Sequence, residues 1–186
     1  MIEAKCSTRK KNSVFARWFG SWQILVQRQP FSSRELTRLY DRAAPRWGRT
    51  LDRLGYPVAY ETLLRKALGE EALQLERARP HVLDCGVGTG ALSMALARAL
   101  PAPFKLDAID ISPHMLERAS SSLCDADLDV TLRHGDVRAL PYGDNVFDLA
   151  MTAHVLEHLV DPSVALTQMV NCAVHLKDSC CRLAQP

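Results

Sequence analysis

A glycine-rich turn and two aspartates form the group of residues best suited to bind a small molecule. The turn, Gly86-Val87-Gly88-Thr89-Gly90, follows a short apolar run, and an apolar-periodic helix starts directly after it. Glycine has no Cβ, so it reaches positive φ without strain and lets a ligand lie against bare backbone. The free amides of the first helical turn then face that ligand with the positive end of the helix dipole. This strand–turn–helix pattern is typical of nucleotide-binding sites, although tight turns also use glycine for purely steric reasons.

The two aspartates stand at the ends of the next two predicted strands. Asp110 comes twenty positions after Gly90 (110 − 90), where a carboxylate can accept hydrogen bonds from both hydroxyls of a ribose. Asp136, which precedes Val137, can accept a hydrogen bond from the amino group of an adenine. Each also has a structural alternative, an acid at a helix start for Asp110 and a simple Gly-Asp turn for Asp136. Because open α/β sheets bind ligands at the carboxyl ends of their strands, the coincidence favours binding.

Asp84 separates two nucleotide interpretations. The first two glycines and Ala91 fit the relaxed dinucleotide fingerprint, with Asp110 in the ribose position. Asp84, two residues before the first glycine, is not needed for a pyrophosphate and would repel it. A carboxylate there suits a cationic ligand, such as the amino group of an amino acid, and Asp136 adds a second negative charge. These residues favour an adenosine with a positively charged amino-acid tail.

The predicted elements that position these residues form one α/β domain. Strands are predicted after Pro80 and at 104–110, 128–134 and 145–151, with helices after the glycine turn and at 112–121 and 161–175. Apolar, poorly alternating strands separated by helices predict an open parallel sheet with helices on both faces, a Rossmann-like fold. The 186 residues suffice for one such domain.

A basic segment, residues 1–30, lies at the start of the chain. It holds six lysines and arginines against the single acid Glu3, a charge of 6 − 1 = +5, and its aromatic and aliphatic residues recur at helical spacing. A basic amphipathic segment of this kind can be an organelle-targeting leader, a membrane-surface helix or a cap packed on the domain.

Residues 31–78 are predicted to form a helical cap. Ser32 and Glu35 fit a capping box, and Pro45 should interrupt the helix that follows. A second helix, at 58–68, should end at Gly69. Tyr40 and Trp47 are predicted to pack in the core, although an N-terminal helix often covers a ligand cleft.

Composition adds little to the functional prediction. The net charge of +2, with 47% apolar and 24% charged residues, is ordinary for a globular protein and gives no case for nucleic acid. No apolar run approaches the ~20 residues of a membrane span. The six cysteines include no C-x-x-C pair, which favours reduced thiols and a cytoplasmic location. The basic N-terminus leaves a mitochondrial location as the alternative.

The sequence resembles the class I S-adenosylmethionine-dependent methyltransferases, most closely the branch that includes the ubiquinone and menaquinone C-methyltransferases. The motifs that carry the resemblance are VLDCGVGTG at 82–90, AIDIS at 108–112, ML at 115–116, GD at 135–136, LPY at 140–142, FD at 147–148 and HVLEHL at 154–159. They cover roughly residues 79–170, inside a methyltransferase domain expected over 79–178, and helices precede them as is usual in the family.

The resemblance implies transfer of a methyl group from S-adenosylmethionine to an O, N or C nucleophile of a small-molecule acceptor. It implies that the glycine turn holds the methionine part, Asp110 the ribose, and Met115, Asp136 and Val137 the adenine. The implied cofactor-binding residues are Asp84, Gly86, Gly88, Gly90, Asp110, Ile111, Met115, Asp136 and Val137.

The histidines of the last motif have two interpretations. His154, Glu157 and His158 fit the H-x-x-E-H signature of inverted zinc proteases, but no glutamate follows Glu157 as a further ligand, so no metal is expected. In methyltransferases this segment is the loop after the fourth strand. If the acceptor must lose a proton, His154 or His158 can act as the base near neutral pH.

The end of the chain departs from the family. Relatives continue past the helix at 164–176 with a Lys-Pro-Gly-Gly turn and three more strands, whereas here DSCCRLAQP ends the sequence at 178–186. We therefore expect a truncated domain with a tail at 179–186 and impaired catalysis. Its fourth strand would have an uncovered edge at which a protein partner or a second copy can pair. Two alternative functions remain, a catalytically idle methyltransferase-like subunit and an NAD-binding oxidoreductase.

Overall fold

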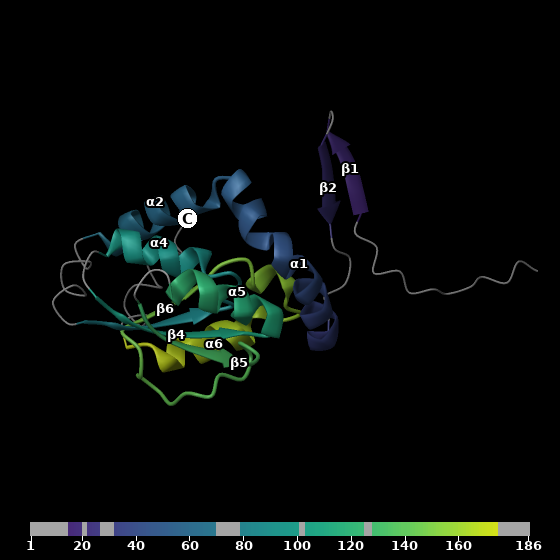
Figure 1. Ribbon diagram of the computed structural model, residues 1–186. Helices are drawn as coiled ribbons and strands as arrows, with labels where there is room; N and C mark the ends of the chain where they lie inside the picture. Colours follow the sequence, from purple (N-terminus) through teal and green to yellow (C-terminus); the bar gives the residue numbers. More distant parts are fainter. Residues whose placement is uncertain are drawn as a thin grey trace, which may run out of the picture.

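The protein is described by a computed structural model, in which residues 32–69, 79–100, 103–124 and 128–174 are placed, together with the backbone of strands at 15–19 and 22–26. The centre of the fold is a sheet of four parallel strands in the order β5-β4-β3-β6 (Figure 1). These strands are β3 (His81–Cys85), β4 (Lys105–Asp110), β5 (Asp129–His134) and β6 (Leu149–Thr152). The prediction of four parallel strands is confirmed, but β6 begins at Leu149 and not at 145.

Helices cover both faces of this sheet, as the strand–helix alternation predicted. On one face lie α4 (Ala91–Ala99) and α5 (Pro113–Cys124), and α2 (Tyr56–Leu68) packs on α4. On the other face, α6 (Pro162–Cys172) buries Ala165, Met169 and Cys172 against the sheet (Figure 1). This is the Rossmann-like arrangement, and it gathers the carboxyl ends of all four strands along one edge.

The helix α1 (Ser33–Arg53) begins with the predicted capping box. The Ser32 hydroxyl accepts from the Glu35 N–H, and the Glu35 carboxylate accepts from the Ser32 N–H at 3.0 Å. The prediction that Pro45 interrupts this helix is wrong, because α1 runs through it without a break. Proline removes one helical hydrogen bond and costs ~3 kcal/mol, yet tertiary packing of the α1 face that buries Ala44 overrides that preference.

The second predicted helix, at 58–68, begins two residues earlier, because α2 starts at Tyr56 with Pro57 in its first turn. Gly55, with φ of 77°, lies between α1 and α2, and Gly69, with φ of 47°, ends α2 as expected. Both angles are in the left-handed region that glycine reaches without strain. The predicted continuation at 70–78 and the tail at 179–186 lie outside the described residues.

Helical spacing at the N-terminus is misleading, because residues 15–26 contain strands. The strand β1 (Phe15–Phe19) pairs antiparallel with β2 (Trp22–Val26). Aromatic and β-branched residues favour strands, and Gly20-Ser21 between the two runs is a spacer typical of hairpins. The remaining residues of 1–31 lie outside the described part of the chain.

The strand β6 lies at one edge of the described sheet. Within the described residues, β6 pairs only with β3, and a single bridge joins Phe147 to Ala173 beside it.

Among the helices of the described residues, none combines the length and the apolar character needed to cross a bilayer.

Candidate functional site

A cleft lies at the carboxyl ends of the four parallel strands, with α1 across it. It encloses about 620 Å³, the space at its mouth included. Most of the residues predicted from the sequence line this cleft: Gly86, Gly88, Asp110, Ile111, Met115, Asp136, Val137, His154 and His158. Two predicted residues, Asp84 and Gly90, do not. The parallel sheet thus brings together loops whose residues, Gly86 and His158, are 72 positions apart in the chain (158 − 86).

The glycine turn is shaped by its backbone. Gly86, Gly88 and Gly90 have φ of 82°, 54° and 87°, angles at which other residues are strained. A Cβ on Gly86 would clash with the Val155 side chain, so the loop after β6 packs directly on the turn. Gly90 instead caps α4 and faces Leu123, away from the cleft. Only the first two glycines therefore present bare backbone near the cleft.

Asp110, at the end of β4, fixes the glycine turn and faces the cleft. Its carboxylate accepts from the Gly88 N–H at 2.8 Å and from the Ser112 N–H at 2.8 Å. A carboxylate has about four acceptor positions, so two backbone donors leave roughly half of them for a ligand. Burial raises the pKa of Asp110, while the two backbone hydrogen bonds oppose that effect.

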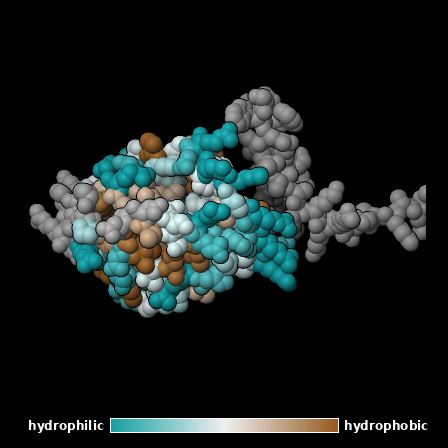
Figure 2. Space-filling model, in the orientation of Figure 1, coloured by the Kyte–Doolittle hydropathy of each residue, from teal (hydrophilic) through white to brown (hydrophobic). Residues whose placement is uncertain are grey.

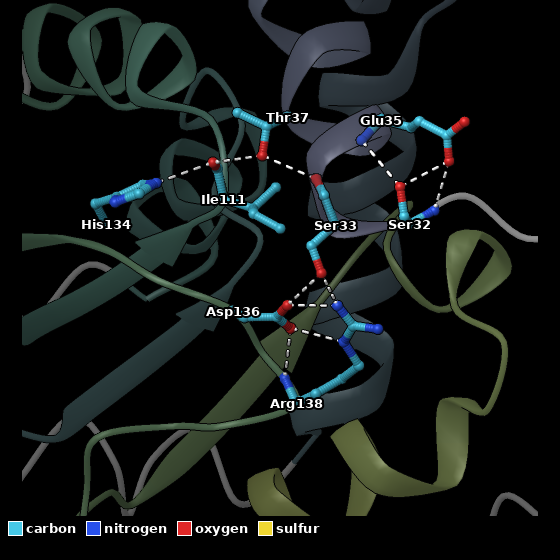
Figure 3. A network of polar contacts seen from close by, with 8 residues as sticks. All are labelled: Ser32, Ser33, Glu35, Thr37, Ile111, His134, Asp136 and Arg138. Carbon is cyan, nitrogen blue, oxygen red and sulfur yellow. Dashed lines mark hydrogen bonds and ion pairs between the residues drawn. The ribbon is translucent and has the colours of Figure 1, made fainter.

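Asp136, at the end of β5, is surrounded by donors (Figure 3). One oxygen accepts from the Arg138 N–H at 3.0 Å and from Arg138 Nε at 2.9 Å. The other accepts from Arg138 Nη2 and from the Ser33 hydroxyl at 3.2 Å. The Arg138 guanidinium also donates to Ser33 and holds the pKa of Asp136 below its usual range. These four donors fill the acceptor positions of the carboxylate.

Asp84 lies beneath the glycine turn and is fully buried, so it is not part of the cleft wall. The Ser93 hydroxyl donates to one of its oxygens at 2.6 Å, while the other has no partner among the described residues. Burial raises the pKa of Asp84 to about 7, and the charge of Asp110 adds to the rise. The structure therefore brings Asp110 and Asp136 into one cleft and leaves Asp84 behind its wall.

His154 lines the cleft in an unusual backbone conformation. Its φ is 57°, in the left-handed region that is uncommon for residues other than glycine. Its Nδ1 lies 3.1 Å from the Glu157 carboxylate, and its ring packs edge-on against Tyr56, with centroids 4.8 Å apart. These contacts fix the orientation of the imidazole from two sides.

His158 is paired with a residue of α1. Its Nε2 lies 2.6 Å from the Tyr40 hydroxyl, and the two rings are T-shaped. Its Nδ1 is buried without a partner among the described residues. Burial lowers the pKa of His158, and burial together with the charges of Glu157 and Asp110 raises that of Tyr40 above its ordinary range. Both side chains are therefore neutral near pH 7.

The inner side of α1 touches the loop after each of the four strands. Ser33 contacts Asp136 after β5, and the Thr37 hydroxyl donates to the Ile111 carbonyl after β4 at 3.3 Å. Tyr40 contacts His158 after β6, and Asp41 accepts from the Ser112 hydroxyl after β4 at 2.6 Å. The Trp47 ring lies near Gly88 after β3. Figure 3 shows the first part of this row. Tyr40 and Trp47, predicted as core residues, thus belong to the cleft wall. The sequence reasoning also missed Ser33 and Arg138.

The part of the chain that the structure describes contains no group of three or more His, Cys, Asp or Glu side chains placed to hold a metal ion. His154, Glu157 and His158 are instead engaged with each other and with tyrosines.

Comparison with known proteins points in the same direction as the geometry. A family model described as a methyltransferase domain matches residues 82–178. The chain is 38% identical to the demethylmenaquinone methyltransferase of Lactiplantibacillus plantarum over 91 residues, which cover 48% of this chain and 38% of that protein. It is 31% identical to the demethylmenaquinone methyltransferase of Desulfitobacterium hafniense over 111 residues, 58% of this chain and 44% of that protein. The matches thus span less than half the length of these relatives.

Solved structures share the fold. A protein of Methanococcus maripaludis, provisionally described as an S-adenosylmethionine-dependent methyltransferase, superposes with a TM-score of 0.53 at 24% identity, covering 80% of this chain and 63% of that one. The cyclase SpnF superposes with a TM-score of 0.54 at 20% identity, covering 77% and 57%. At these identities the likeness concerns the architecture alone, and an architecture hosts many chemistries.

Proposed function

The chain belongs to the class I S-adenosylmethionine-dependent methyltransferases, and from that premise we propose that it methylates a small molecule bound in the cleft under α1. The main support for the proposal is the placement of the Asp110 carboxylate. It is oriented by the Gly88 and Ser112 amides, faces the cleft and keeps acceptor positions unused. A buried carboxylate with spare acceptors suits a pair of vicinal hydroxyls.

The residues around Asp110 fit the family's cofactor. Ile111, Met115 and Val137 are apolar neighbours suited to an adenine, and the bare backbone of Gly86 and Gly88 suits the chain that extends from the ribose. Asp84, behind the glycine turn, keeps one oxygen without a partner among the described residues, and its ionised form would add negative potential beside the Gly86 and Gly88 backbone. When bound, S-adenosylmethionine supplies an electrophilic methyl group on a sulfonium whose departure needs no acid.

His154 is the better placed of the two candidate bases. Its Nδ1–H is donated to Glu157, which leaves Nε2 as the proton acceptor, and Nε2 has no hydrogen bond within the described residues. His158, by contrast, has Nε2 engaged by Tyr40 and Nδ1 buried. We therefore assign proton removal to His154 and the closing of the cleft under α1 to His158 with Tyr40.

The acceptor side of the cleft is apolar and aromatic. Leu36, Tyr40, Trp47, Val155 and Leu159 line it. Such walls exclude water and favour a flat, weakly polar acceptor. An aromatic ring with a nucleophilic oxygen or carbon fits this description, and the hydroquinone form of demethylmenaquinone, the compound for which the relatives are named, belongs to that class.

Ligand-induced shifts of the melting temperature test the proposal. S-adenosylmethionine should raise the melting temperature in proportion to its occupancy, whereas NAD should not. A shift with NAD alone would instead establish the oxidoreductase alternative. Binding of S-adenosylmethionine without methyl transfer to any member of a panel of aromatic hydroxy compounds would support an idle subunit.

The assignment of the base has its own test in the same transfer assay. With an acceptor that must lose a proton, His154→Gln should lower the rate by about 10²–10⁴-fold, the usual contribution of a general base. His158→Gln should act mainly on acceptor binding. Equal rate losses in the two variants would contradict the assignment.

A further inference from the structure

The outer side of α1 carries an uninterrupted row of arginines. We call Arg34, Arg38, Arg42, Arg46, Arg49 and Arg53 the arginine stripe; all six are exposed. They follow one another at intervals of three or four residues, the spacing that places side chains on one side of a helix. Over a helix of 21 residues the stripe extends along roughly 30 Å.

The arginine stripe lies opposite the cleft. The residues that α1 buries are Leu36, Ala44 and Leu51, and Tyr40 and Trp47 line the cleft from the same inner side. Figure 2 shows hydrophilic surface gathered over α1. One side of the helix therefore closes the cleft, while the other presents positive charge to the surroundings.

Nothing in the described part of the chain neutralises the stripe. None of its six guanidinium groups makes an ion pair or hydrogen bond there, whereas Arg65, Arg98 and Arg138 each contact a carboxylate. The acids of α1 are engaged elsewhere or are too few. Glu35 is held in the capping box and Asp41 accepts from Ser112 and His114. Asp52 is exposed and is a single carboxylate against six guanidinium groups.

The stripe also has no explanation within the helix. Like charges at i,i+4 repel and destabilise a helix, and the stripe contains four such pairs in sequence. The helix dipole favours only the arginine of the last turn, Arg53. A row of charges that opposes helix stability fits an external anionic surface that offsets the repulsion.

We propose that the arginine stripe docks the protein on the surface of an anionic lipid bilayer. Guanidinium groups bind phosphate and carboxylate in a bidentate manner, and a straight row of them matches a plane of lipid headgroups. Leu39, between Arg38 and Arg42, and Leu54, after Arg53, are 43% and 66% exposed. Apolar side chains beside cations enter the boundary between headgroups and acyl chains, while a nucleic-acid backbone offers them no apolar phase.

The sequence before α1 continues the same charge. Residues 1–30 add a net charge of +5, which strengthens attraction to the same leaflet. Docking through the outer side of α1 leaves its inner side on the cleft. Binding to the bilayer and binding in the cleft are thus separable by mutation.

Vesicle flotation of the full chain tests the proposal. The protein should float with phosphatidylcholine vesicles that contain phosphatidylserine, should not float with phosphatidylcholine alone, and should be released by salt. The stripe variant, Arg38→Gln with Arg42→Gln and Arg46→Gln, should bind on the order of a hundredfold more weakly, since each cation near an anionic surface contributes about a factor of five. Glutamine keeps helix propensity, and loss of like-charge repulsion should leave the melting temperature unchanged or higher.

A matched control carries the same loss of charge elsewhere. Lys66→Gln with Lys105→Gln and Arg118→Gln removes three exposed cations outside α1 and should bind vesicles nearly as well as the unaltered chain. Equal losses in the two triple variants would overturn the proposal, because net charge alone would then explain the binding. Stripe-dependent binding to a single-stranded RNA, without binding to anionic vesicles, would overturn it in favour of nucleic acid. The same S-adenosylmethionine affinity in the stripe variant and the unaltered chain is expected.

Discussion

The carboxyl ends of β4 and β5 each place an aspartate in the cleft wall, but the two are engaged differently. Asp110 is held by two backbone amides and is largely buried, and its pKa is raised. Asp136 accepts from four donors of Arg138 and Ser33, and its pKa is lowered. The Asp110 carboxylate is oriented and keeps acceptor positions for a ligand, while the acceptor positions of Asp136 are filled by donors of Arg138 and Ser33.

This difference shows that topological position does not determine how ready a group is for a ligand. Both aspartates occupy the place where open sheets bind ligands. A donor that approaches Asp110 gains a hydrogen bond outright, whereas a donor that approaches Asp136 must displace one already present. Of the four donors on Asp136, the Ser33 hydroxyl is uncharged and makes the longest contact, so it should be displaced first.

The largest expected effect is on Asp110. Asp110→Asn should weaken S-adenosylmethionine binding by about 100-fold, because two hydrogen bonds to a charged acceptor are lost or reversed. Isothermal titration calorimetry measures the change. Asp129→Asn, at the exposed start of β5 and outside the cleft, serves as the control and should bind as the unaltered chain does. An unchanged affinity in Asp110→Asn would remove the basis for the ribose role.

The corresponding change at Asp136 should cost less. Asp136→Asn should weaken binding by about 10-fold or less, because a ligand donor gains little from a carboxylate that must first release another donor. The same calorimetric titration gives the value. A loss as large as that of Asp110→Asn would show that the two strand ends contribute equally and would contradict the comparison.

Removing the most weakly held competitor should improve binding. Ser33→Ala frees one acceptor position on Asp136 and should tighten S-adenosylmethionine binding by about 2–5-fold, the range of one neutral hydrogen bond. Ser32→Ala is the matched control, since it weakens the helix cap without touching Asp136. Weaker binding in Ser33→Ala alone would indicate that the hydroxyl supports the ligand and does not compete with it.

The smallest effect concerns stability and pH. The pKa of Asp136 is lowered by Arg138, so its ionised form stabilises the fold above about pH 4, and that contribution is lost as the pH falls through this range. Asp136→Asn should therefore destabilise by roughly 0.5 kcal/mol at pH 7 and by less at pH 3, since a partly exposed pair is screened by solvent. Urea denaturation at several pH values measures the difference.

Asp110 should show the opposite dependence on pH. Because burial raises its pKa, the ionised form lowers stability as the pH rises above about 4. The stability of Asp110→Asn relative to the unaltered chain should therefore increase with pH in the same denaturation series. Parallel profiles for the two variants would contradict the contrast between the two strand ends.

The sequence predicted the strand-end loops that line the cleft better than the residues through which α1 covers it. The alternation of strands and helices, the glycine turn with its positive φ angles and the position of Asp110 follow from local patterns, and Gly86, Gly88 and Asp110 line the cleft while Gly90 does not. Parallel strands have their carboxyl ends at one edge, so local patterns suffice to bring these loops together.

The covering of the cleft by α1 depends on contacts between residues far apart in the chain, which local sequence patterns do not predict. Tyr40 and His158 are 118 positions apart, and Ser33 and Arg138 are 105 apart, so no spacing rule links them. Asp84 shows the converse, because alternation along β3 turns its side chain into the core toward Ser93. The N-terminal strands were missed because a 3.6-residue period and a two-residue period are hard to separate over so few residues.

A single helix that touches all four loops has a consequence for the speed of ligand exchange. A molecule that enters or leaves the cleft past α1 must displace a helix held at several points along its length, so association and release by that route become slow together. Weakening one of those points, for instance with Tyr40→Phe, should shorten the residence time and speed loading while the ratio of the two rates changes little. Stopped-flow measurements would then separate the affinity for the ligand from the rates at which it binds and leaves.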